Sequence, residues 1–106
     1  MKMGIIIYSA DQETAWNALR IANCALMNGD EVEIFLLAKG VELDSLDSEA
    51  FNIKELVLGV KNQGGKMMAC STCVQNRDMP EYCLCETSKG MECYQLIKDC
   101  DKVLTF

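Results

Sequence analysis

The sequence of 106 residues contains no histidine. Without an imidazole there can be no Ser-His-Asp triad, no Cys-His protease site and no histidine-ligated zinc. Any chemistry therefore depends on cysteine, carboxylate, lysine, arginine or tyrosine side chains, or on a bound cofactor. Long apolar runs are also missing: none approaches the roughly 18 residues that a membrane-spanning helix requires. We therefore expect no membrane partner.

Basic side chains are scarce as well. Ten lysines and arginines stand against sixteen aspartates and glutamates, which gives a net charge of −6 and a pI near 4.5. A protein that binds a phosphate backbone needs a basic stripe, so direct binding to nucleic acid is not expected. Half of the residues are apolar, and a length of about 100 residues suits one globular domain. We expect a single domain over residues 1–106.

Cysteine, in contrast, is abundant, with seven residues. An odd number leaves at least one thiol outside any intramolecular disulfide framework, and the first residues do not resemble a signal peptide. We therefore expect a cytoplasmic protein whose thiols stay reduced and serve packing, metal or sulfur chemistry. Cys24, on an alanine-rich helical segment, is expected to be buried and inert. Cys93 and Cys100, seven residues apart, are expected to pack in the core.

Apolar runs alternate with segments of helical periodicity. Strands are predicted at 3–8, 31–37, 66–70 and 102–106, and helices at 13–28, 52–62, 71–77 and 88–99. Residues 81–88 fit either a short strand or a loop, and the carboxylate-rich segment 38–51 is interpreted as a solvated loop or short helix. This alternation predicts an α/β fold with right-handed crossovers and a mainly parallel sheet.

Capping residues mark the ends of these helices. Ser9 or Asp11 is expected to accept the first free amides of the first helix, and Gly29 to follow its last turn. Thr87 or Ser88 is expected to cap the last helix.

Cys70 falls at the carboxyl end of the strand predicted at 66–70, directly before a helix. Ligands of open parallel sheets bind beyond such strand ends, and free backbone amides and the helix dipole stabilise a thiolate there. Cys73 follows on the same side of the first helical turn. We therefore take Cys70 and Cys73 as the candidate catalytic pair. The alternative is that they are merely small, half-buried cysteines, and Arg77 adds positive potential only if the chain folds back.

A second interpretation includes two further thiols. Cys70, Cys73, Cys83 and Cys85 form a C-x2-C-x9-C-x-C pattern, and four thiolates suffice for zinc or an iron–sulfur cluster. The C-x-C half is not the usual second half of a zinc ribbon, so we favour sulfur chemistry without a cofactor and keep the metal site as the alternative. The glycine pair at 64–65 precedes a strand, whereas a phosphate-binding glycine loop follows one. Nucleotide binding therefore has no support.

Several segments, taken in order, resemble the DsrE/DsrF-like family. They are Asn-Ala-Leu-Arg-Ile-Ala-Asn at 17–23, Gly-Asp-Glu-Val at 29–32, Phe-Leu-Leu at 35–37 with Gly-Val at 40–41, and Ala-Cys-Ser-Thr-Cys at 69–73 ahead of Arg77. The resemblance implies a three-layer α/β/α sandwich with a five-stranded parallel sheet, usually assembled into trimers or hexamers. Some members carry sulfur as a cysteine persulfide, in sulfur oxidation or in thiolation of a tRNA base.

Cys70 is the position that matches the sulfur acceptor of those members. We therefore expect Cys70 to receive sulfane sulfur from a donor protein and to pass it to an acceptor, with Cys73 resolving the persulfide. Such a protein is a carrier or sulfurtransferase more than a turnover enzyme. The segment 80–93 departs from the pattern, because it adds three thiols where relatives commonly have few or none. A metal-binding module and a structural or regulatory oligomer subunit therefore remain as alternatives.

Overall fold

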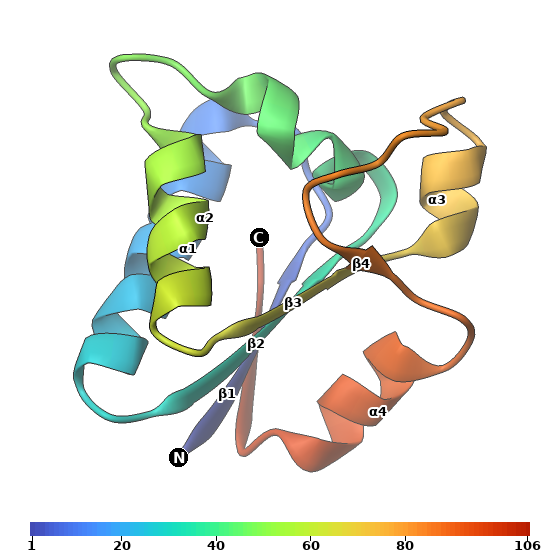
Figure 1. Cartoon of the computed structure of the whole chain (residues 1–106). Helices are drawn as coiled ribbons and strands as arrows, with labels where there is room; N and C mark the ends of the chain where they lie inside the picture. The colour runs from blue at the N-terminus through green and yellow to red at the C-terminus, as the bar shows by residue number, and fades with distance from the viewer.

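The computed structural model describes residues 1–106, and strands and helices alternate along it (Figure 1). The elements are β1 (Lys2–Ile7), α1 (Gln12–Met27), β2 (Glu31–Leu36), the 3-10 helix η1 (Ala38–Leu46), α2 (Ile53–Asn62), β3 (Lys66–Ala69), α3 (Ser71–Gln75), β4 (Glu86–Thr87), α4 (Glu92–Asp99) and β5 (Lys102–Thr105). The five strands form one sheet in the order β4-β3-β2-β1-β5, and every neighbouring pair is parallel. The predicted α/β class and parallel sheet are confirmed.

Helices cover the sheet on both faces. Helices α1 and α2 lie together over one face, and α4 lies on the other (Figure 1). Alternate side chains of β1 point to opposite faces of the sheet. Ile5 and Ile7 belong to a core cluster of eighteen buried residues. Ile6 belongs to a cluster of only three, with Phe35 and Leu96. Burial of each such side chain contributes roughly 1.5–3 kcal/mol. The layer under α4 is therefore thin.

The first helix begins and ends where the sequence predicts. Asp11 occupies the N-cap and accepts a hydrogen bond from the Thr14 amide at 2.9 Å. Gly29, with a φ of 88°, follows the C-cap and makes the left-handed turn that favours glycine. None of the helices combines the length and apolar character that crossing a bilayer demands.

Two expectations about helix residues are wrong. Helix α4 is capped not by Thr87 or Ser88 but at Met91, where the Glu92 carboxylate accepts hydrogen bonds from the Lys89 and Gly90 amides. Cys24 is exposed, because it falls outside the buried stripe of α1. That stripe consists of Ala15, Ala18, Leu19, Ala22 and Ala25.

The segment after β2 forms η1 and lies directly against the end of β1. A Cβ atom at Gly40 would stand 1.9 Å from the Ile7 carbonyl oxygen, so only glycine permits this approach. The close contact brings the first turn of η1 to the carboxyl edge of the sheet, the edge at which β3 also ends.

Candidate functional site

Cys70 lies at the point where β3 becomes α3. Its amide still donates to the Leu36 carbonyl at 2.9 Å and so continues the ladder with β2. Its side chain turns back as the N-cap of α3, and its Sγ accepts a hydrogen bond from the Cys73 amide at 3.3 Å. Helix α3 has only five residues, so the polar contact of the Cys70 sulfur is this single amide and not a long helix dipole. Cys70 is half-buried, so part of the residue remains in contact with solvent.

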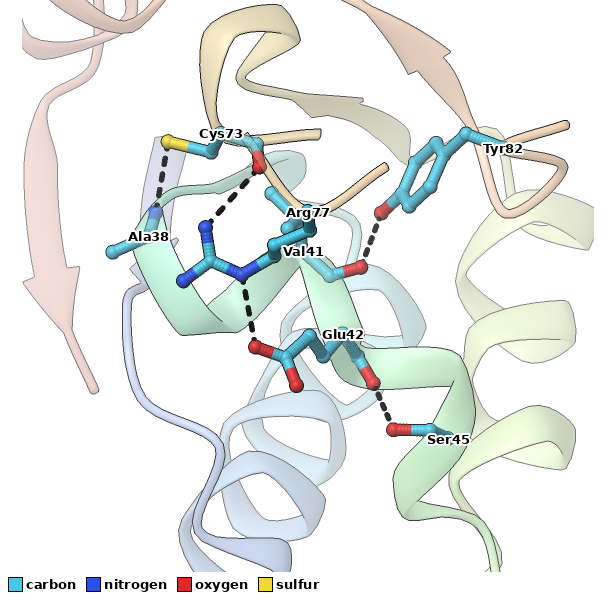
Figure 2. Close-up of polar contacts among 7 residues, drawn as sticks. All are labelled: Ala38, Val41, Glu42, Ser45, Cys73, Arg77 and Tyr82. Carbon is cyan, nitrogen blue, oxygen red and sulfur yellow. Dashed lines mark hydrogen bonds and ion pairs between the residues drawn. The ribbon is translucent and has the colours of Figure 1, made fainter. Parts of the chain in front are cut away.

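Cys73 is held from the opposite side by the turn after β2. The Ala38 amide donates to Cys73 Sγ at 3.2 Å, as Figure 2 shows. Ala38 has a φ of 52°, a left-handed conformation that costs a residue with a Cβ about 1–2 kcal/mol. Nothing in the sequence marks Ala38 as a site residue, since a left-handed alanine has no compositional signal.

The thiol of Cys73 has a perturbed acidity. Burial and the neighbouring Cys70 side chain raise the pKa of Cys73, while the Ala38 amide and the positive charge of Arg77 act in the opposite direction. Since the raising influences prevail, Cys73 keeps its proton near neutral pH. The pair therefore places a hydrogen-bonded sulfur at Cys70 next to a protonated thiol at Cys73, which is the arrangement of a nucleophile with a second, reserve thiol.

Arg77 does fold back onto this site. Its Nη1 donates to the Cys73 carbonyl oxygen at 3.1 Å and its Nε to the Glu42 carboxylate at 2.9 Å, and both contacts are visible in Figure 2. Glu42 lies in the segment interpreted as a solvated loop or short helix, which forms the 3-10 helix η1, and its carboxylate joins η1 to the end of α3. The ion pair fixes a positive charge beside Cys73, which no spacing rule could show.

The four-cysteine metal arrangement is not assembled in the chain. Cys83 is exposed, and its thiol donates to the Glu81 carbonyl at 3.0 Å. Cys85 packs against the main core, where burial raises its pKa to about 11. No group of three or more cysteine or carboxylate side chains converges as metal ligands do. The structure thus brings Cys70 and Cys73 together and leaves Cys83 and Cys85 apart from them.

The contacts of Tyr82 help to hold the segment that carries Cys83 and Cys85 away from Cys70 and Cys73. Its hydroxyl donates to the Val41 carbonyl at 2.8 Å (Figure 2), and burial raises the pKa of Tyr82. Lys61 donates to the Leu84 carbonyl. These contacts hold the segment over η1 and α2, on the side of the sheet that bears the main core.

Cys93 and Cys100 both pack against the small cluster under α4, as the core-packing interpretation predicts. Both are half-buried, and burial raises the pKa of each thiol.

Comparisons with known proteins give the chain relatives over its full length. It is 37% identical to the uncharacterized protein MJ0989 of Methanocaldococcus jannaschii, an alignment that covers all of both chains. It is 35% identical to the uncharacterized protein MK0008 of Methanopyrus kandleri, over 90% of this chain and 84% of that one. Among solved structures, the ychN protein of E. coli superposes with a TM-score of 0.83 at 23% identity, covering all of both chains. That likeness shows the same fold.

The family comparison agrees with the fold. The model of the DsrE/DsrF-like family matches residues 1–106, the whole length of the sequence. The chain belongs to the DsrE/DsrF-like family.

Proposed function

We propose that the protein carries sulfane sulfur, the outer sulfur atom of a persulfide, on Cys70. The observation that carries this proposal is the hydrogen bond from the Cys73 amide to Cys70 Sγ, at a partly exposed position on the carboxyl edge of the sheet. An amide donor stabilises the anionic sulfur, both as thiolate and as persulfide. Membership of the DsrE/DsrF-like family supports it, since Cys70 matches the sulfur acceptor of the sulfur-relay members.

Loading requires no cofactor. The Cys70 thiolate attacks the outer sulfur of a donor persulfide, a new S–S bond forms at Cys70, and the bond within the donor breaks. The donor cysteine leaves as a thiolate with that electron pair. An acceptor thiolate then repeats the same exchange on the outer sulfur at Cys70, so sulfur moves without net oxidation or reduction. No histidine takes part in the exchange, and the Cys73 amide is the group that donates a hydrogen bond to the attacking sulfur.

Cys73 has a different part in this scheme. When no acceptor arrives, its sulfur attacks the inner sulfur of the Cys70 persulfide, closes a Cys70–Cys73 disulfide and expels hydrosulfide. The thiol proton leaves with the hydrosulfide, the sulfane sulfur is reduced and the two cysteines are oxidised. The Ala38 amide and the Arg77 charge stabilise the Cys73 anion as it forms.

The partners of such a carrier are a sulfur-donor protein and a sulfur-acceptor protein in a reducing cytoplasm. We also propose the homo-oligomer, a trimer or hexamer, that the family resemblance implies. Three large apolar side chains exposed on and beside α4, at Met91, Tyr94 and Ile97, support an assembled state.

The test is to incubate the protein with inorganic polysulfide at one sulfane sulfur per chain and to map the adduct. Alkylation followed by trypsin places Cys70 and Cys73 in one peptide, 67–77, and the exposed Cys24 and Cys83 in two others. At the earliest times we expect sulfur chiefly on peptide 67–77, retained in Cys73→Ser and lost in Cys70→Ser. Equal loading of the Cys24 and Cys83 peptides, or full loading of the Cys70→Ser chain at 67–77, would overturn the proposal.

A further inference from the structure

A third thiol shares the packing environment of Cys70, against the small cluster under α4, whereas Cys73 packs against the main core. Cys93, in the first turn of α4, packs against the same small cluster of Ile6, Phe35 and Leu96 that Cys70 contacts. The charge of Cys70 reaches it: burial first, and then Cys70, raise the pKa of the Cys93 thiol. Cys70 thus has one neighbouring thiol on α3 and another on α4.

Ser88 fixes this neighbourhood. It is the one buried polar residue of the chain, 6% exposed, and it bonds on both sides of Cys70. Its amide donates to the Ala69 carbonyl at 2.7 Å, and its Oγ accepts from the Ser71 amide at 3.3 Å. The Glu92 carboxylate then closes the turn by accepting from the Lys89 and Gly90 amides, both at 2.8 Å. The beginning of α4, with Cys93, is therefore held against the turn that carries Cys70.

The two sulfurs differ in a way that sets a direction for exchange. Cys70 Sγ receives the Cys73 amide, which makes its anion a good leaving group. Every cause that acts on Cys93 raises its pKa, and a thiol of higher pKa is the stronger nucleophile once ionised and the poorer leaving group. Sulfane sulfur that exchanges between two such thiols accumulates on the poorer leaving group, which here is Cys93.

We propose that Cys93 is the storage thiol of the carrier, which takes the outer sulfur from Cys70 and holds it beneath α4. This inference rests on the proposed loading of Cys70. In the transfer, Cys93 sulfur attacks the outer sulfur of the Cys70 persulfide, a Cys93–sulfur bond forms and the Cys70–sulfur bond breaks. Cys70 keeps the electron pair as a thiolate, and the proton of the Cys93 thiol moves to the outer sulfur, which ends as a hydropersulfide on Cys93. No oxidant or reductant is consumed.

Trypsin separates the relevant thiols. Cys70 and Cys73 fall in peptide 67–77, Cys93 in peptide 90–98 and Cys100 in peptide 99–102. The experiment adds inorganic polysulfide at one sulfane sulfur per chain, alkylates samples at increasing times and measures the sulfur on each peptide. In the wild-type chain we expect sulfur first on 67–77 and later, for more than half of the adduct, on 90–98. In Cys93→Ser and Cys93→Ala it should stay on 67–77.

Cys100→Ser is the matched control, because Cys100 contacts the same cluster yet follows the far end of α4; it should behave as wild type. Sulfur that stays on 67–77 in the wild-type chain, with the time course of Cys93→Ser, overturns the inference and leaves the proposed function intact. Loading of 90–98 in Cys70→Ser at the wild-type rate also overturns it, because Cys93 would then react directly with polysulfide. If peptide 67–77 carries no sulfur in any folded variant, the result contradicts the proposed function itself.

Discussion

The Ala38 amide donates a hydrogen bond to Cys73 Sγ at 3.2 Å, and Ala38 adopts a left-handed φ of 52° in doing so. This contact joins the end of β2 to the first turn of α3, on the same edge as Cys70. Two residues later, Gly40 allows η1 to lie against the end of β1. A strained residue that aims a donor at a sulfur atom is a feature of a functional site more than of a packing contact.

Substitution of Ala38 tests this strained turn. Ala38 is exposed, so a larger side chain meets little steric conflict beyond its own backbone. Glycine relieves the left-handed strain but adds chain entropy to the unfolded state, and we expect Ala38→Gly to lie within about 1 kcal/mol of wild type. Ala38→Val should unfold at least about 1 kcal/mol more easily than Ala38→Gly, since β-branched residues disfavour this conformation. Urea denaturation of both variants measures the difference, and equal stabilities would contradict the assignment.

Arg77 is predicted to tune Cys73 and not merely to tie α3 to η1. Arg77→Gln removes the positive charge that lowers the pKa of Cys73, so that pKa should rise and alkylation of Cys73 near neutral pH should slow. Glu42→Gln breaks the same ion pair but leaves the guanidinium beside the Cys73 carbonyl. It should therefore alkylate at Cys73 as fast as wild type or faster. Fragmentation of the tryptic peptide that contains Cys73 gives the rates; this peptide is 67–77 in wild type and Glu42→Gln, and 67–89 in Arg77→Gln, which lacks the cleavage site at 77. Equal slowing in both variants would show a structural role only.

Cys83 and Cys85 are two residues apart but differ in burial, so their reactivities can be compared within one chain. Burial raises the pKa of Cys85 to about 11, whereas Cys83 is exposed. Iodoacetamide at pH 8 should therefore modify Cys83 well before Cys85, because only the thiolate reacts. The Cys85 rate should keep rising as pH approaches 11. Similar rates for the two thiols at pH 8 would show that the 81–88 segment does not hold its contact with the core.

Gly40 is predicted to be essential to the fold of the site. A Cβ atom there would stand 1.9 Å from the Ile7 carbonyl oxygen, a clash with backbone that no side-chain rotation relieves. Gly40→Ala should cost about 3 kcal/mol or more of stability, at the upper end of overpacking effects. Gly90→Ala is the matched control, because its nearest neighbour is a flexible Glu92 oxygen at 4.0 Å. A Gly40→Ala chain as stable as Gly90→Ala would contradict the placement of η1.

Much of the fold could be predicted because local signals and burial agree. The run from 3 to 8 has no polar interruption before its end, which is typical of a strand covered on both faces, and β1 lies there. Asp11 and Gly29 mark the ends of α1 because a carboxylate cap and a left-handed glycine each have one local function. Such signals depend on neighbours in the sequence alone.

The site could be predicted only in part, because its decisive contacts join distant segments. The spacing of Cys70 and Cys73 suffices to predict their proximity, since one helical turn separates them. Ser88 is a residue type that often caps helices, which is why the sequence predicts a cap there. In the structure its hydroxyl is instead buried beside Cys70, where it accepts a hydrogen bond from the Ser71 amide. Arg77 and Glu42 meet across 35 positions, and the exposure of Cys24 depends on which stripe of α1 faces the sheet.

The most direct measurement of the central claim compares two single-cysteine chains. One keeps Cys70 alone and the other keeps Cys83, a thiol that is more exposed but donates its own hydrogen bond to a carbonyl. Circular dichroism verifies that both are folded, and intact mass follows the gain of one sulfur atom from polysulfide at neutral pH. A sulfur activated by its surroundings should load the Cys70 chain about tenfold faster or more. Equal rates, or faster loading at Cys83, would contradict the account.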